Sequence, residues 1–490
     1  MIDVEDVVPQ QVHGPGGDDA GVYYSIDEAL SAAEFGRFQY SVLAYAGLGY
    51  LMDAMEVMLL SFIGPSVKSL WGLSAAEEGL ITTVVFAGML IGAYSWGVFS
   101  DNFGRRKTML SIAIVTTIFA LLSSFSPNYT SLLVLRALVG TGLGGGSVYL
   151  CWFLEFVPPK NRGMWMVIFS TFWTVGTILE AILAWVVMPG LGWRWLLVLS
   201  SLPSFAAVAF YGFSVESPRY LCTIGRIKDA HSILQRIAEV NQTKLPVGML
   251  VCEQMTVVNQ EALLPKQNNS YARYKAGFSS LFSIFSSSLI GTTLLIWVQY
   301  FGNAFLYYGV VLMTSELSSD QTSCMSTISD SNDGSSLYRD VFFTSLAEVP
   351  GLILAAVLVD KIGRKFSMVF MYALGFLFLL PLVLQQDEAL TTLLLSGARM
   401  CFLGTFTITV IYCPEIYPTS VRTTGSGVAN AVGRIAGMIC PIVAVQFISG
   451  CEIMAAILLF EVIAVVSGLC VLLFRTETKG QQLSDTVVAS

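Results

Sequence analysis

Long apolar runs separated by short polar segments recur along most of this chain. Many runs reach 18 or more residues, enough for a helix to cross about 30 Å of hydrocarbon. Each must be helical, because lipid offers no partners to open backbone groups. The pattern predicts twelve spans, at residues 38–63, 77–99, 108–126, 129–154, 164–187, 193–214, 284–313, 337–359, 366–384, 389–413, 423–449 and 451–474.

The scarcity of charge supports the same interpretation. Only 12% of the 490 residues are charged, against about 25% in a soluble protein. We therefore predict an all-α membrane protein with twelve transmembrane helices, surrounded by a lipid bilayer. The sequence holds no nucleophile elbow, Walker loop, metal-ligand cluster or nucleic-acid motif. We expect no enzyme, no metal, no cofactor and no nucleic-acid partner.

The distribution of basic residues predicts the orientation. Of the 26 Lys and Arg, three fall in outer loops and three within spans, which leaves 20 on one side. This bias places that side, with both termini, in the cytoplasm. Plasma membrane and vacuolar membrane fit equally. The six exceptions are Lys68, Arg194 and Arg339 outside, and Arg136, Arg399 and Arg434 within spans.

The chain divides into five segments. Residues 1–37 form a cytoplasmic N-terminal segment, in which Ser25 and Glu28 have the spacing of a capping box. Residues 226–240 of the central linker have the apolar periodicity of an amphipathic helix. The predicted segments are 1–37, the six-helix bundle 38–214, the linker 215–283, the six-helix bundle 284–474 and the tail 475–490.

The two bundles repeat one another. Asp101-Asn-Phe-Gly-Arg105-Arg106-Lys107 has a shorter copy, Asp360-Lys-Ile-Gly-Arg364-Lys365, 259 residues later. Three charged pairs follow at offsets of 263, 260 and 260 residues: Arg136 with Arg399, Glu155 with Glu415, and Arg162 with Arg422. Two parallel six-helix halves related by an axis along the membrane normal are typical of one large transporter class.

These motifs identify a family resemblance. The chain resembles the major facilitator superfamily over its whole length, in its sugar-porter-like and synaptic-vesicle-protein-like branch. Within that branch it is similar to plant organic cation/carnitine transporters, which are related to niacin transporters. The residues that carry the resemblance are the Asp101 loop, Arg136-x-x-x-Gly140, Glu155 with Arg162, Glu216-Ser-Pro-Arg219, Pro414-Glu415-Ile-Tyr-Pro418 with Arg422, Glu477-Thr-Lys-Gly480 and Met52-Asp-Ala-Met-Glu56.

The resemblance implies a gating role for the charged loops. A carboxylate followed by cations can hold helix ends together in one state and release them in another. We expect Glu155 to pair with Arg422 and Glu415 with Arg162 when the cytoplasmic side is shut; pairing within each half is the alternative. The gating candidates are Asp101, Arg105, Arg106, Glu155, Arg162, Asp360, Arg364, Glu415 and Arg422.

Ionisable residues inside spans are candidates for substrate or proton binding, because burying them in lipid is costly. Asp53 and Glu56 lie three residues apart, on one helix face. Two such acids repel when both are ionised, which suits proton coupling; a static pair with Arg136 is the alternative. The ionisable candidates are Asp53, Glu56, Arg136, Glu180, Glu348 and Arg399.

Polar and aromatic residues complete the candidate site. Gln299, Asn303 and Tyr307 recur every four residues and form a stripe on the seventh helix. Asn303 and Tyr307 resemble the sugar-porter substrate helix, but Tyr300 and Phe301 after Gln299 depart from its glutamine pattern. Interhelical hydrogen bonding is the alternative. Trp173 offers an aromatic wall, or core packing, and the run from Gly140 to Gly146 predicts close helix packing.

The sequence thus predicts a secondary active transporter that works by alternating access, coupled to protons. The resemblance implies a monomer that carries a small organic solute, either nicotinate-like or an organic cation such as carnitine. The alternatives are a sugar porter and a transport-silent sensor or binding protein on the same fold.

Overall fold

The computed structural model describes residues 23–158, 162–251, 284–286, 289–318, 335–384, 387–417, 422–449 and 452–479. The side chains of a few helical residues, Asp360 and Arg422 among them, lie outside this description.

Twelve membrane-spanning helices are present in the described residues, which confirms the predicted number. The first six spans are α2 (Arg37–Met58) with α3 (Leu60–Trp71), α4 (Ala75–Phe103), α5 (Arg105–Ser124), α6 (Tyr129–Leu143) with α7 (Gly146–Leu154), α8 (Arg162–Leu191), and α9 (Trp193–Ser200) with α10 (Leu202–Ala209) and η2 (Phe210–Phe213). The last six are α15 (Ile290–Ser318), α16 (Ser335–Leu346) with α17 (Glu348–Ile362), α18 (Arg364–Leu379) with η3 (Leu380–Val383), α19 (Glu388–Ile416), α20 (Arg422–Ser449) and α21 (Ile453–Leu473).

Several spans consist of two helices separated by a break, close to prolines or glycines that weaken the hydrogen bonds of the helix backbone. A proline lacks an N–H and clashes with the carbonyl four residues earlier. Pro350 acts on Leu346, the last residue of α16, and so accounts for the break at Ala347. Pro65 lies within α3, where it acts on Ser61 rather than on the break at Leu59. The fourth span breaks at two consecutive glycines before α7. These breaks place backbone and side chains of α2, α7 and α17 around the middle of the bundle.

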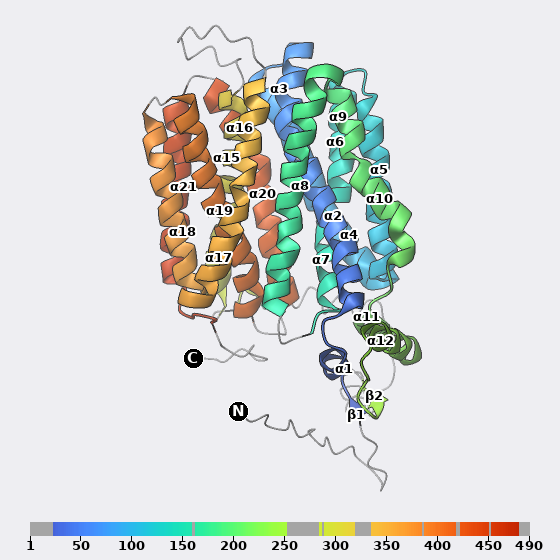
Figure 1. The fold of residues 1–490 in the computed structure, drawn as a ribbon. Helices are drawn as coiled ribbons and strands as arrows, with labels where there is room; N and C mark the ends of the chain where they lie inside the picture. Colours follow the sequence, from blue (N-terminus) through green and yellow to red (C-terminus); the bar gives the residue numbers. More distant parts are fainter. Residues whose placement is uncertain are drawn as a thin grey trace.

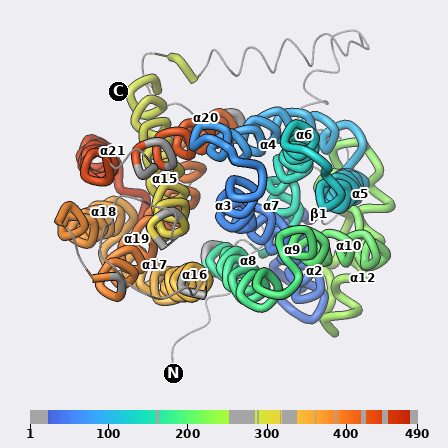
Figure 2. The backbone as a smooth tube through the Cα atoms, turned by 90° about the horizontal axis from the view of Figure 1, so that it is seen from above, coloured from blue at the N-terminus to red at the C-terminus, as the bar shows by residue number. Residues whose placement is uncertain are grey.

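The helices form two groups that lie side by side, α2–α10 in one and α15–α21 in the other (Figure 2). Helices α4 and α8 of the first group pack against α20 and α16 of the second. We call these groups the first and second halves.

Glycines allow the first half to pack tightly. A Cβ on Gly88 or Gly92 of α4 would overlap a backbone carbonyl of α6, at Ala137 or Thr141. A Cβ on Gly140 of α6 would likewise overlap the carbonyl of Val85. This confirms the predicted close packing through the glycine run, the usual way helix backbones approach in lipid.

A small element lies beyond one end of the bundle (Figure 1). It comprises β1 (Tyr23–Tyr24), α1 (Ile26–Ala33), α11 (Pro218–Thr223), α12 (Ile227–Asn241) and β2 (Met249–Leu250), with β1 parallel to β2. The predicted capping box at Ser25 is confirmed, as is the amphipathic helix α12, which buries Ala230, Leu234 and Ile237. We call this end, which also carries the Asp101 loop, the basic end, and the other the distal end.

The two halves touch at the distal end. Phe62 packs against Tyr338 and Trp185 against Phe342, with ring centroids 6.0 and 5.9 Å apart. Thr83 donates a hydrogen bond to the Met438 carbonyl at 2.9 Å. Among the described residues, the hydrogen bonds between the halves lie in the middle of the bundle or toward this end. The conformation is therefore closed at the distal end.

Candidate functional site

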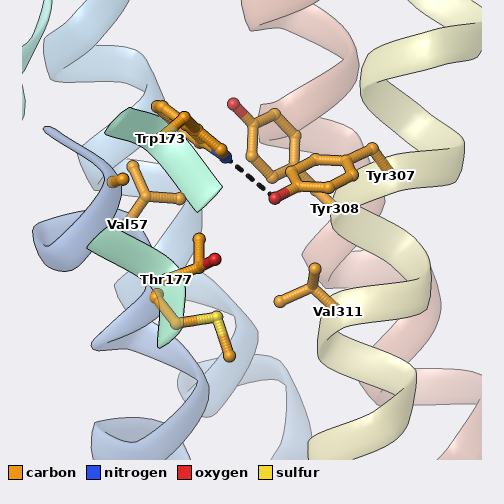
Figure 3. A pocket seen from close by; sticks show the side chains of 8 residues that line it. Val57, Trp173, Thr177, Tyr307, Tyr308 and Val311 are labelled. Atoms are coloured by element: carbon orange, nitrogen blue, oxygen red, sulfur yellow. Dashed lines mark hydrogen bonds between the residues drawn. The ribbon is translucent and has the colours of Figure 1, made fainter. Parts of the chain in front are cut away.

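A small cavity lies between the halves in the middle of the bundle (Figure 3). Its volume is about 10 Å³, close to the roughly 10–15 Å³ that a single water needs and far below the roughly 300–1,000 Å³ of ordinary ligand pockets. A solute therefore needs the halves to move apart in order to bind in full. The lining residues come from α2, α8 and α15: Ala54, Val57, Met58, Trp173, Thr177, Tyr307, Tyr308 and Val311.

A hydrogen-bonded chain crosses from one half to the other beside this cavity. Trp173 of α8 donates to the Tyr307 hydroxyl at 2.9 Å, and that hydroxyl donates to Glu348 at 2.8 Å (Figure 3 shows the first bond). Glu348 also accepts from Thr177 at 3.2 Å and pairs with Arg399 at 2.7 Å. Because both charged side chains are fully buried, each depends on the other to neutralise its charge.

A second buried cluster lies inside the first half. Arg136 pairs with Glu56 at 2.8 Å, with both side chains fully buried, and also donates to Ser123. Glu180 accepts hydrogen bonds from Ser200 at 2.8 and 2.9 Å. Glu56, Arg136 and Glu180 therefore belong to the interior of one half rather than to the cavity wall.

Asp53 lies near this cluster but has no ion-pair partner among the described residues. It is buried, with one carboxylate oxygen lacking any hydrogen bond. Its other oxygen lies against Gly146 at the start of α7, where a Cβ would overlap it.

The polar stripe on α15 divides between two environments. Gln299 donates to the Ser467 carbonyl at 2.6 Å and accepts from Tyr372 at 3.0 Å. Asn303 bonds Tyr372, Thr405 and Thr409 at 2.6–2.8 Å. Both amides thus face the interior of the second half, away from the cavity. In this conformation both amides form the interhelical hydrogen bonds of the alternative interpretation, and their contact with substrate stays a prediction.

Charged residues form a cluster at the basic end of the first half. Arg105 pairs with Glu155 at 3.2 Å and with Asp101 at 3.1 Å. Glu216 accepts from the backbone N–H groups of Arg105 and Arg106 at 2.9 and 3.3 Å, and so caps α5. The Arg106 guanidinium lies 4.6 Å from the centre of the Tyr211 ring. Burial raises the pKa of Glu155, and Arg105 opposes that rise.

The second half repeats this cluster. Arg364 holds Glu415 through two hydrogen bonds at 3.0 and 3.1 Å. Glu477 accepts from the backbone N–H groups of Arg364 and Lys365 at 2.9 Å each, and so caps α18. Glu216 and Glu477 thus cap helices, a role that their place in the family motifs did not predict. Their shared signal is an acid placed after the sixth span of each half.

The gate carboxylates pair within their own halves in this conformation. Glu155 binds Arg105 and Glu415 binds Arg364, as the within-half alternative proposed. Arg162 lies 3.6 Å from Asp27 of α1 instead of pairing with Glu415. The cross-pairs are expected in the state that is shut at this end, whereas the present conformation is closed at the opposite end, so they stay a prediction. The side chains of Asp360 and Arg422 lie outside the described residues.

The sequence analysis missed four residues of the site. Tyr50 stacks on Phe169 with ring centroids 4.7 Å apart and leans on Trp173 at 5.3 Å. Thr177 and Tyr308 line the cavity. Arg434 was identified as a charge within a span but not as part of the site. Neither Tyr50 nor Thr177 has a signal of its own in the sequence, because aromatic and hydroxyl residues are common in spans.

Known proteins resemble this chain over nearly its full length. The family described as "Sugar (and other) transporter" matches residues 34–488. The "Organic cation/carnitine transporter 7" of Arabidopsis thaliana is 52% identical over 494 residues, covering 96% of this chain and 98% of that protein. The "Synaptic vesicle 2-related protein" of Bos taurus is 34% identical and covers 98% of this chain and 85% of its own length. The xylose transporter XylE from E. coli, in a partially occluded inward-open conformation, shares the fold, with a TM-score of 0.70, 17% identity and coverage of 91% and 100%.

Proposed function

Given that this chain belongs to the sugar (and other) transporter family of the major facilitator superfamily, we propose that it carries a small organic solute with a positive charge. The solute is an organic cation or a zwitterion such as carnitine, and its movement is coupled to protons. Transport follows alternating access, in which the two halves open the central site to one side and then to the other.

The charge balance in the middle of the first half is the observation that carries this proposal. Asp53, Glu56 and Glu180 are buried there with Arg136 as their counter-charge among the described residues. Full ionisation of all four groups would leave a net charge of −2 in a region of low dielectric. A bound proton or a bound cationic solute would each reduce that negative charge. Proton binding and solute binding therefore meet the same electrostatic requirement.

Aromatic rings support a cationic solute. Tyr50, Trp173, Tyr307 and Tyr308 gather where the halves meet. A desolvated cation over such a ring gains about 0.5–2 kcal/mol. The similar Arabidopsis protein is named for organic cations and carnitine. Nicotinate is negatively charged at neutral pH, so this site favours it less.

The basic end is the cytoplasmic end in our proposal, with both termini on that side of a plasma or vacuolar membrane. The conformation described above is then open toward the cytoplasm. When the cytoplasmic end closes, Arg162 leaves Asp27 for Glu415, and Glu155 and Arg422 meet. Such inter-half ion pairs in a partly dry interface bias the equilibrium by roughly 1–3 kcal/mol.

Uptake of labelled solutes into proteoliposomes tests the proposed substrate class. The purified protein is given carnitine, choline, nicotinate or glucose in turn, with empty liposomes as the control. We expect saturable uptake of carnitine that exceeds uptake of nicotinate and glucose. Uptake of glucose alone would make the protein a sugar porter. Binding of carnitine, seen as thermal stabilisation, without any flux would make it a sensor.

A further inference from the structure

Arg434 differs from the other two arginines in the middle of the membrane. Arg136 and Arg399 each pair with a buried carboxylate, at 2.8 and 2.7 Å. Arg434 has no carboxylate within ion-pair distance among the described residues, and its buried Nε has no hydrogen-bond partner there. Its Nη1 lies 3.7 Å from the Met89 sulfur, which is only a weak acceptor.

The position of Arg434 on α20 directs it to the boundary between the halves. Gly433 lies against Tyr300 and Ala304 of α15, and Gly437 lies against the Phe86 ring of α4. Arg434 itself reaches Met89 of α4 and so contacts the first half from the second. Arg434 also meets the Tyr308 hydroxyl, which carries no compensating charge. A guanidinium without a carboxylate partner at such a place is costly, and intramembrane charges are retained chiefly for function.

Asp53 presents the opposite charge from the first half. It has a buried oxygen without a hydrogen-bond partner, and its other oxygen lies against Gly146. Gly144, at the same break in the fourth span, lies against Met89, the residue that Arg434 reaches from the second half. Asp53 and Arg434 form no direct ion pair in this conformation. Tyr308 lines the cavity together with Ala54, the chain neighbour of Asp53, and its ring centroid lies 4.7 Å from that of Phe86, which lies against Gly437 of α20. The arrangement thus offers a carboxylate, a guanidinium and aromatic rings at one junction.

We propose that Arg434 is a specificity-determining residue that binds a carboxylate of the transported solute, while Asp53 and the tyrosine rings bind its cationic end. This inference rests on the proposed function and narrows its substrate class to zwitterions. A guanidinium suits a carboxylate because its planar donors match both oxygens. The bound solute would link the two halves, which explains why its binding drives them together.

A comparison of carnitine with choline tests this role, because both carry a trimethylammonium group and only carnitine carries a carboxylate. In proteoliposomes, Arg434→Gln should lower carnitine uptake at least tenfold relative to wild type. Choline uptake in the same variant should stay within about threefold of its wild-type value. Asp53→Asn should lower uptake of both solutes. Arg194→Gln, which removes a cation that contacts the Ser126 carbonyl near the distal end, should change neither.

The ratio of carnitine uptake to choline uptake distinguishes the possible outcomes. If Arg434→Gln lowers both solutes equally, or leaves carnitine uptake unchanged, Arg434 does not bind the carboxylate. If Arg434→Gln does not fold, Arg434→Lys decides: it should keep a reduced preference for carnitine over choline, and loss of folding or of both activities would contradict the inference. If wild-type protein transports neither solute, the proposed function itself fails.

Discussion

Side chains in the middle of the bundle differ in how many of their polar atoms have a hydrogen-bond or ion-pair partner. Arg399 binds Glu348 and lies close to Tyr307, Thr344 and Met58. Asp53 has an oxygen with no partner among the described residues. In the proposed function, the Glu348–Arg399 pair maintains the shape of the second half, whereas Asp53 is available to a ligand.

The Glu348–Arg399 pair yields a stability prediction. Arg399→Met leaves Glu348 buried without its counter-charge, which costs about 3–5 kcal/mol. The double variant Glu348→Met with Arg399→Met should recover most of that loss, because no isolated charge remains. Thermal unfolding of the purified protein in detergent measures both. A double variant as unstable as the single one would contradict the account of this pair.

The sequence predicts which residues are candidates for the site better than it predicts which neighbours their side chains contact. Intramembrane charge alone identified Glu348, Arg399 and Asp53, because lipid makes such residues costly. Helical spacing placed Gln299, Asn303 and Tyr307 on one stripe, yet only Tyr307 reaches the cavity. A stripe along a 29-residue helix can meet different neighbours along its length. Spacing does not reveal which neighbour each residue meets.

Helix α1 shows how one element can act on another. Its Asp27 accepts from Arg219 of α11 and lies 3.6 Å from Arg162 at the start of α8. Arg162 is also the residue expected to reach Glu415 in the other state. In the proposed alternating access, the N-terminal helix and the second half would therefore compete for one arginine.

Removal of the Asp27 charge tests that competition. Asp27→Asn should release Arg162 and favour opening of the distal end, by up to about fivefold, since exposed ion pairs contribute about 0–1 kcal/mol. A cysteine in place of Thr83, at the distal contact, should then react faster with an impermeant thiol reagent. Asp229→Asn removes a charge from α12 that pairs with Arg226 at 2.7 Å, and serves as the control. Equal labelling in both backgrounds would rule out the competition.

Element boundaries were predictable where hydrophobicity sets them and not where prolines do. The twelve spans follow from apolar length. The first span extends to Trp71, beyond its predicted end at residue 63, because α3 continues past Pro65 after the break at Leu59. The small element with β1 and β2 depends on contacts between residues more than 200 positions apart. Local patterns carry no signal for such pairing.

At the scale of the whole molecule, the halves are similar in architecture and different in charge. The first half buries Asp53, Glu56 and Glu180 with one arginine, whereas the second has Arg399 and Arg434 with Glu348, and Glu461 on α21, away from the first half (Figure 2). In the proposed function, a solute between the halves meets negative charge on one side and positive charge on the other. The duplicated fold would then provide the movement, and the unequal charges at the boundary the selectivity.

A measurement of solute-driven proton movement tests the central claim most directly. Purified protein is reconstituted in liposomes that contain a pH-sensitive dye, and carnitine is added outside. The account predicts a change in luminal pH that follows carnitine uptake, disappears with a protonophore and is absent from empty liposomes. Carnitine uptake with no change in luminal pH, at a rate that the protonophore does not alter, would contradict it.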